Sequence, residues 1–168
     1  WEDIWYKARQ GTTLTNLSPI YDARGDYATA LDYLKRSLAI WEEIGDKAGQ
    51  GTTLNNISQI YDARGDYATA LDYLKRSLAI QEEIGDIAGL CATLFNIGHI
   101  HLQNEEFQEA YSAWVTVYKL AKPRKIAQAL DALENQANRL GLEGGLDAWE
   151  KLAEEYPQYN LPSLQTSQ

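Results

Sequence analysis

Two histidines and one cysteine are the side chains in this sequence best suited to metal binding or nucleophilic chemistry. His99 and His101 lie two positions apart, and on a helix that spacing points them to different faces, so they cannot hold one metal ion together. His101 takes the position that Tyr61 occupies forty residues earlier and is expected to pack in the core, whereas His99 is expected to line a groove. Cys91 has no neighbouring Lys or Arg to lower its thiol pKa, so we interpret it as a small, semi-buried packing residue.

Adjacent carboxylates supply no catalytic pair either. Glu42 and Glu43, like Glu82 and Glu83, diverge because sequence neighbours do not face each other on a helix. No phosphate-binding loop, dinucleotide fingerprint or zinc-binding helix motif is present. The glycines of GLEGG at 141–145 have neither a preceding strand nor a following Lys-Ser or Lys-Thr. We therefore expect no enzyme activity, no cofactor and no bound metal.

Composition narrows the class of partner. The chain has 168 residues, with 15 Lys and Arg against 24 Asp and Glu, which gives a formal net charge of −9. This charge argues against nucleic acid and anionic membranes as main partners. No apolar run approaches the ~18 residues of a membrane helix, and we expect no signal peptide. A single cysteine forms no internal disulfide and favours a reducing compartment, so a cytoplasmic location is expected.

An internal repeat determines the predicted fold. Residues 11–50 and 51–90 align without a gap and differ at six of forty positions. Residues 91–120 continue the period more loosely, and residues 1–10 are a divergent copy of 41–50. Apolar residues recur at helical spacing within each repeat, and Gly-Asp pairs end one helix and cap the next. We predict helices near 2–23, 26–44, 46–63, 66–84, 86–103, 106–121, 124–141 and 144–156, with Lys122-Pro123 ending the sixth.

These residues resemble the tetratricopeptide repeat. The positions that match its pattern are Leu54, Ile57, Tyr61, Gly65, Tyr67, Ala70, Leu74 and Ser77. Ser58 stands where the pattern usually has Gly, and the 40-residue period is similar to Pins-type and kinesin-light-chain-type repeats. The resemblance implies an all-α, right-handed superhelix (α-solenoid) of four antiparallel helix pairs that binds peptides or protein surfaces on its concave face. Its expected divisions are three repeats at 1–44, 45–84 and 85–121, a capping helix pair at 122–156 and an irregular tail at 157–168.

The resemblance also places a set of side chains on the concave face, because the first helix of each pair lines the groove. These groove positions are Thr12, Thr15, Pro19 and Asp22 in the first repeat, Asn55, Gln59 and Asp62 in the second, and Phe95, His99 and Leu102 in the third. Stepping back along the first helix in fours and threes adds Trp5 and Trp1 to the same stripe. Pro19 lies inside that helix, where it removes a hydrogen bond to Thr15, and we expect a kink there.

Positions at which the near-identical repeats differ suggest which residues serve a function specific to one repeat. Trp5 and Tyr6 replace a Gly-Asp pair, which should let the first helix extend back to about residue 2. Together with Trp1 and Trp41 they predict an aromatic N-terminal hot spot for a partner. The alternative is that Trp1 and Trp5 cover the unpaired N-terminal edge as a cap.

The sequence therefore predicts a non-catalytic protein-binding scaffold. A resemblance to the repeats of this family that clamp an acidic chain terminus would require a set of Lys and Asn at the groove positions. This sequence instead has Thr15, Pro19, Asn55, Gln59, Phe95 and His99 there, and Asp22 and Asp62 favour a neutral or basic ligand. Two origins stay open: a natural regulatory or adaptor module, and an engineered binder fitted to a chosen target. Self-association through the N-terminal edge is a further alternative.

Overall fold

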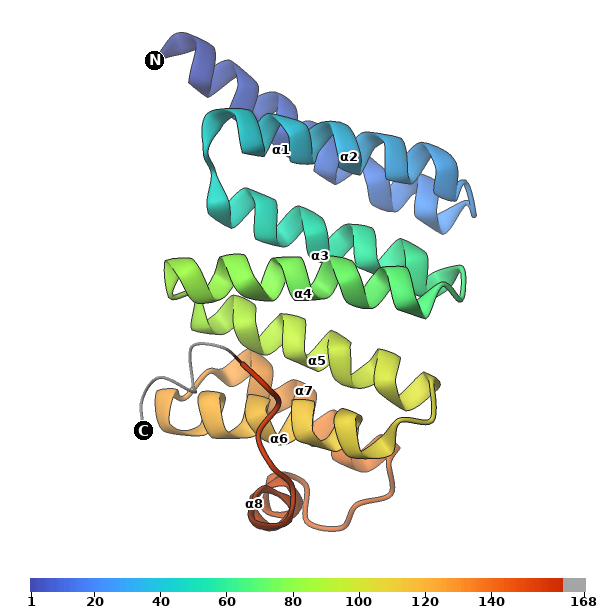
Figure 1. The fold of residues 1–168 in the computed structure, drawn as a ribbon, viewed down its shortest axis with the longest axis vertical. Coiled ribbons are helices and arrows are strands. Elements are labelled where there is room, and N and C mark those ends of the chain that lie inside the picture. The colour runs from blue at the N-terminus through green and yellow to red at the C-terminus, as the bar shows by residue number, and fades with distance from the viewer. Residues whose placement is uncertain (162–168) are drawn as a thin grey trace. The chain divides into compact units, whose positions relative to one another are not determined.

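A computed structural model describes residues 1–161, which form eight α-helices and no strand (Figure 1). The all-α class predicted from the sequence is confirmed. The chain divides into two compact parts, the N-terminal half Trp1–Gly85 and the C-terminal half Asp86–Gln168. Of the tail predicted at 157–168, residues 162–168 lie outside the described part.

The N-terminal half consists of two helix pairs. Helix α1 (Glu2–Ala23) pairs with α2 (Tyr27–Ile44), and α3 (Lys47–Ala63) pairs with α4 (Tyr67–Ile84). As predicted, α1 extends back to Glu2 and runs through Pro19 without ending there.

The Gly-Asp pairs act as the sequence predicts. Gly45 and Gly85 follow α2 and α4 with φ of 72° and 69°, a left-handed conformation that glycine adopts without a Cβ penalty. The carboxylate of Asp46 then accepts a hydrogen bond from the Gly49 N–H at 2.9 Å, which caps α3. Asp26, Asp66 and Asp86 cap the following helices in the same way. These turns fix where each helix begins, and so which face it presents to its neighbours.

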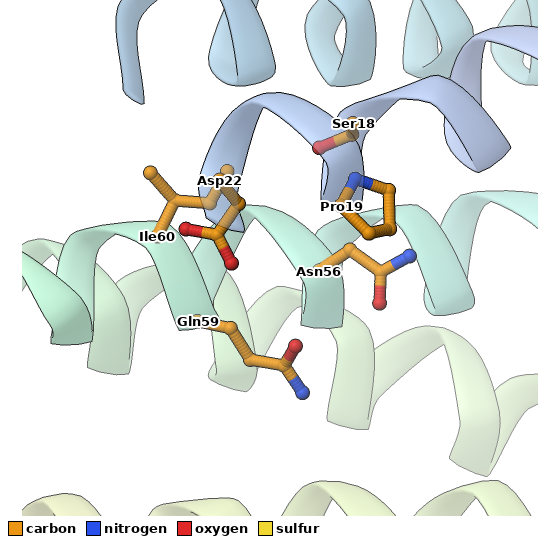
Figure 2. A pocket seen from close by; sticks show the side chains of 6 residues that line it. All are labelled: Ser18, Pro19, Asp22, Asn56, Gln59 and Ile60. Carbon is orange, nitrogen blue, oxygen red and sulfur yellow. The ribbon is translucent and has the colours of Figure 1, made fainter. Parts of the chain in front are cut away.

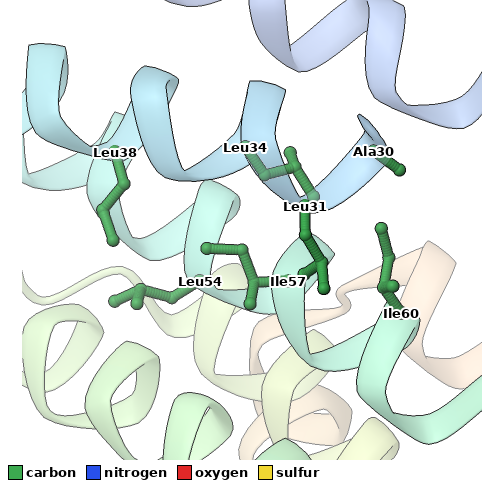
Figure 3. Close-up of a cluster of buried hydrophobic side chains, with 7 residues drawn as sticks. All are labelled: Ala30, Leu31, Leu34, Leu38, Leu54, Ile57 and Ile60. Carbon is green, nitrogen blue, oxygen red and sulfur yellow. The ribbon is translucent and has the colours of Figure 1, made fainter. Parts of the chain in front are cut away.

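Leucines and isoleucines at helical spacing form the core of the N-terminal half. Figure 3 shows the part of this core that lies between α2 and α3. Its members are Ala30, Leu31, Leu34, Leu38, Leu54, Ile57 and Ile60. Helix α2 therefore packs on its own partner α1 and also on the first helix of the next pair.

The C-terminal half contains α5 (Ile87–Gln103), α6 (Phe107–Arg124), α7 (Ala127–Arg139) and α8 (Leu146–Glu155). Helix α6 has ten buried residues and contacts the other three helices. Figure 1 shows α8 nearly end-on, so α8 runs across α6 and not along it. Trp149 of α8 is fully buried, and its indole N–H donates to the Leu133 carbonyl at 2.7 Å.

The sixth helix was predicted to end at residue 121, before Lys122-Pro123, but it ends three residues later. Helix α6 continues through Pro123 to Arg124 and ends at Lys125, which has a left-handed φ of 53°. Proline removes only one backbone N–H, and the last turn of α6 tolerates that loss. The following helix consequently begins at Ala127 and not near residue 124.

Candidate functional site

The first turns of α1 carry exposed aromatic side chains. Trp1 is fully exposed, and Trp5 and Tyr6 each retain 65% of their accessible surface. Ile4, which the sequence analysis did not single out, is exposed beside them. The Arg9 guanidinium lies 5.6 Å from the centroid of the Trp5 ring, within the range of a cation–π contact. The predicted aromatic residues of α1 are therefore accessible at one end of the N-terminal half.

Trp41 does not belong to this aromatic surface, and its interpretation as an exposed hot-spot residue was wrong. Only 7% of its surface is exposed. Its indole fills the space left by two glycines: a Cβ added to Gly11 would lie 2.8 Å from the ring, and one added to Gly49 would lie 2.6 Å from it. Trp41 is a core residue that packs against both α1 and α3.

Thr15 and Asn55 occupy equivalent groove positions, but their polar groups form hydrogen bonds inside the helix pairs. The hydroxyl oxygens of Thr15 and Ser37 lie 2.8 Å apart, and the Asn55 amide donates to the Ser77 hydroxyl at 3.0 Å. Each serine also donates to a backbone carbonyl of the first helix, at 2.9 and 2.8 Å. The Thr–Asn difference between the repeats is thus accommodated by internal hydrogen bonding. Thr12 stays exposed, and its hydroxyl donates to the Ala8 carbonyl of its own helix at 3.0 Å.

A pocket of about 100 Å³ opens between α1 and α3 (Figure 2). Three of its residues were predicted as groove residues: Pro19, Asp22 and Gln59. Figure 2 shows Pro19 and Asp22 of α1 facing Gln59 of α3 across it. A carboxylate beside an amide can accept from and donate to a polar ligand group, while the proline ring offers an apolar contact.

The other three pocket residues are Ser18, Asn56 and Ile60, which the sequence analysis missed. Each is a sequence neighbour of a predicted groove residue. The sequence prediction placed groove residues along one face of each helix. A pocket between two helices is also lined by residues on the sides of those helices that face each other. Aligning the repeats identifies these positions, but only the tertiary arrangement of α1 and α3, which both pack on α2, brings them together.

Asp62 is the groove residue with the most unusual environment. Burial raises the pKa of its carboxyl above the usual range, and its Oδ1 atom has no hydrogen-bond partner among the described residues. The equivalent Asp22 lines the pocket. Both repeats of the N-terminal half therefore place an acidic group at the same groove position.

In the C-terminal half, Phe95 and His99 form an aromatic group with the buried Trp114. The His99 ring meets the Phe95 and Trp114 rings edge to face, with centroids 4.8 and 5.5 Å apart. Burial, aided by the positive charge of Arg139, lowers the pKa of His99. Leu102 is half-buried on the same helix. These predicted groove residues have aromatic and apolar surroundings, unlike the polar pocket of the N-terminal half.

His101 and Cys91, which the sequence analysis considered for chemistry, lie in surroundings that suit a packing role. His101 is buried, and its Nδ1 atom lies 2.5 Å from Glu106 Oε2. Burial raises the pKa of the Cys91 thiol to about 11, so the thiol is neutral at physiological pH. In the described part of the chain, no three His, Cys, Asp or Glu side chains gather where they could hold a metal ion. None of the described helices combines the length and apolar character needed to cross a membrane.

A family model described as a tetratricopeptide repeat matches residues 9–83. The resemblance predicted from the sequence is thereby confirmed for this stretch. No curated protein matches the chain by sequence.

Several solved structures share the fold. Aspartyl phosphate phosphatase F from Bacillus subtilis aligns with 88% of this chain and 38% of its own, at 18% identity and a TM-score of 0.73. A putative kinesin light chain with nearly identical repeats, from Podosopora anserina, aligns over 89% of this chain and 74% of its own, at 18% identity and a TM-score of 0.66. BtubC from P. vanneervenii aligns over 86% and 62%, at 16% identity and a TM-score of 0.64. This chain therefore spans about two fifths of the phosphatase and three fifths of BtubC.

Proposed function

We propose that this chain, whose residues 9–83 are tetratricopeptide repeats, binds a protein or peptide through the groove face of its N-terminal half. Such repeats serve as protein-interaction scaffolds and are generally non-catalytic. By the groove face we mean the surface that carries Thr12, Pro19 and Asp22 on α1 and Gln59 and Asp62 on α3.

The observation that carries the proposal is the pocket between α1 and α3. It combines the Asp22 carboxylate with the amides of Asn56 and Gln59 and the apolar surfaces of Pro19 and Ile60. This mixture suits an extended peptide, whose backbone amides need both donors and acceptors. A pocket of about 100 Å³ is large enough for one small side chain or part of a larger one. The pocket is therefore best regarded as one contact point within a longer groove.

Charge favours a neutral or basic ligand. Asp22 and Asp62 are acidic, none of the groove-face residues is cationic, and the whole chain carries a net charge of −9. Opposite charge on a ligand would speed its encounter and penalise acidic competitors. The exposed Trp1, Trp5 and Tyr6 support an adjoining hot spot, since aromatic rings bury much area at low entropic cost.

A peptide array graded in net charge tests this function directly. Wild-type protein should retain neutral and basic peptides, and Asp22→Lys should lose the basic ones by about tenfold or more, which corresponds to ~1.4 kcal/mol. Asp72→Lys is the matched control, because Asp72 is exposed on α4, away from the groove face, and the change in net charge is the same. Equal losses in both variants would show that net charge, and not the pocket, selects the peptides.

Paired pull-downs with mass spectrometry would then identify the natural ligand. One bait is the wild-type chain, and the other carries Trp5→Gly, Tyr6→Asp and Pro19→Gln, the residues of the second repeat. Trp41 is left unchanged because it is buried in the core. Equal recovery of every protein by both baits would show that Trp5, Tyr6 and Pro19 are not part of the site.

The hypothesis of an engineered binder has less support than the six departures suggested. Trp41 and Thr15 serve internal packing and hydrogen bonding, so they need no target to account for them. Of the six differences between the repeats, Pro19 and Lys47 are exposed, and Trp5 and Tyr6, which precede the aligned residues 11–50, are exposed as well. A natural gene that encodes the same residues would contradict an engineered origin.

A further inference from the structure

Helix α1 has an unpartnered face that its near-copy α3 buries. The face is a stripe of four residues at helical spacing, Gln10, Thr13, Leu17 and Ile20, which we call the α1 edge stripe. Its equivalents forty residues later are Gln50, Thr53, Ile57 and Ile60, and all four are buried. Ile60 retains 2% of its accessible surface, whereas Ile20 retains 48%.

Helix α2 covers the equivalent stripe on α3. Figure 3 shows Leu31 and Leu38 of α2 directed toward α3, where they share one core cluster with Ile57 and Ile60. The Gln50 amide also donates to the Trp41 carbonyl of α2 at 3.3 Å. The same chain thus shows what lies against this stripe when it is covered. The covering element is an antiparallel amphipathic helix that supplies leucines and one backbone carbonyl, which accepts the hydrogen bond from the glutamine amide.

The α1 edge stripe keeps the means to receive such a helix. Gln10 repeats the amide of Gln50, and Leu17 and Ile20 repeat the apolar contacts of Ile57 and Ile60. Exposed Tyr6, four residues before Gln10, lengthens the surface by about one turn toward the N-terminus.

The covering helix does not enter through the turn that joins α2 to α3. That turn is Gly45-Asp46, and Trp5-Tyr6 stand at the equivalent positions inside the continuous helix α1. The chain therefore runs straight through the place where α2 turns into α3. A helix placed like α2 is therefore not linked to α1 by the connection that links α2 to α3.

One further substitution specifies the covering helix. Arg9 of α1 stands where α3 has Gly49, and Gly49 is the residue that makes room for the Trp41 ring. A tryptophan at the Trp41 position of the incoming helix would collide with Arg9. Helix α4 has the same sequence as α2 over all eighteen residues except that Gln81 replaces Trp41, and a glutamine side-chain oxygen can accept a hydrogen bond from Arg9.

We propose that the α1 edge stripe docks an amphipathic helix of another tetratricopeptide protein, a helix with the sequence pattern of α4 and a polar residue at the Gln81 position. This surface is separate from the groove face, so the proposal stands apart from the function proposed above.

Two peptides taken from this chain provide a matched test. Their sequences are those of residues 66–85 and 26–45, which include the capping Asp and the terminal Gly and differ only at Gln81 and Trp41. Each is labelled with a dye and titrated with the full-length protein while fluorescence anisotropy is measured. The 66–85 peptide should bind, and the 26–45 peptide should bind several-fold more weakly.

Three variants of the protein report on the site. Ile20→Asp and Thr13→Arg place a charge on the stripe and should each weaken binding of the 66–85 peptide about tenfold or more. Both residues are exposed, so neither change disturbs the pairing of α1 with α2. Arg9→Gly should restore binding of the 26–45 peptide, because it recreates the space found at Gly49. Asp22→Lys, which tests the groove face, should leave binding of both peptides unchanged.

Three results would overturn the proposal. The first is the absence of binding by the 66–85 peptide. The second is binding that Ile20→Asp and Thr13→Arg leave intact, which would mean that the peptide exchanges with an internal helix. The third is a concentration-dependent dimer of the protein alone, seen by sedimentation and abolished by Ile20→Asp, which would make a second copy of this chain the occupant.

Discussion

At the scale of single residues, Trp41 and Gln81 occupy equivalent positions but leave different amounts of space beside the neighbouring glycines. Gly11 and Gly51 are equivalent, yet a Cβ on Gly11 would lie 2.8 Å from the Trp41 ring and one on Gly51 would lie 3.6 Å from the Gln81 side chain. The first distance requires a shift of the indole, whereas the second is an ordinary van der Waals contact. Gly11 is therefore required by its neighbour, and Gly51 is not.

This difference predicts opposite effects of one substitution in the two repeats. Gly51→Ala should stabilise the protein by about 0.5–1 kcal/mol, since alanine is the better helix former. Gly11→Ala gains the same helix propensity but overpacks the indole, at a cost of about 1–3 kcal/mol, so it should be neutral to destabilising. Urea unfolding of the two variants measures both effects.

Trp41→Gln supplies the control. In that background Gly11→Ala should behave like Gly51→Ala, because the ring that it meets is gone. A Gly11→Ala variant that loses the same stability with and without Trp41 would show that the glycine is needed for some other reason.

His99 provides a second prediction at this scale. Its pKa lies below the usual value of about 6.5 because burial and the charge of Arg139 both disfavour the imidazolium. The unfolded chain therefore binds a proton more readily than the folded one, and stability falls as pH decreases from about 6.5 through the pKa of the folded state. His99→Gln should flatten this part of the stability profile. Arg139→Gln should raise the His99 pKa, which nuclear magnetic resonance can follow because the chain has only two histidines.

At the scale of elements, α1 and α3 are nearly the same helix in two environments. Pro19 lies inside α1, where it removes one backbone hydrogen bond, and the equivalent residue in α3 is Gln59. A proline in a helix interior costs about 3 kcal/mol, of which about 1 kcal/mol is recovered by stiffening the unfolded chain. Pro19→Gln should therefore raise the free energy of unfolding by about 2 kcal/mol, and Gln59→Pro should lower it by a similar amount.

Thermal unfolding of both variants checks this pair of expectations. If Pro19→Gln leaves the stability unchanged, α1 has already adapted to proline, and the residue cannot be regarded as a stability cost accepted for ligand binding. Pro19→Gln also changes the lining of the pocket, so its effect on the peptide array should be read beside its effect on stability.

Elements were the part of the molecule that the sequence predicted best, for a physical reason. Helix ends are set by local signals, and the Gly-Asp pairs placed four turns correctly because glycine and aspartate act within one turn of the backbone. The end of α6 was placed too early, since Pro123 lies where the helix can still tolerate it. The surroundings of Trp41 were missed because they depend on two glycines in two other helices. A large residue that departs from a repeat beside retained glycines is the signal that could have found them.

The candidate site was predicted only in part, because a pocket needs the offset between helices as well as the face of each one. Pro19, Asp22 and Gln59 follow from the repeat pattern. Ser18 and Asn56 do not, because they lie on the flanks that α1 and α3 turn toward each other (Figure 2). Tertiary contacts of this kind leave no periodic trace in the sequence.

At the scale of the whole molecule, the number of buried residues differs widely between the helices. Helix α1 has three buried residues, α3 has eight, and α6 has ten. In a repeat protein each element is stabilised mainly by its immediate neighbours, so an element with one neighbour opens more readily than an element with two. Helix α1 should therefore open by local fluctuations that leave the rest of the chain folded.

Hydrogen exchange can test this with an internal control. Residues 11–23 and 51–63 differ at only three positions, so differences in amide exchange between them report packing and not local sequence. Amides of α1 should exchange faster than their equivalents in α3, by about tenfold for each 1.4 kcal/mol of lost packing, and α6 should be the slowest helix. Equal rates in α1 and α3 would mean that the exposed edge costs α1 no stability. If the 66–85 peptide docks on the α1 edge stripe, its addition should slow exchange in α1 and leave α6 unchanged, which would link the free energy of the uncovered edge to the partner that covers it.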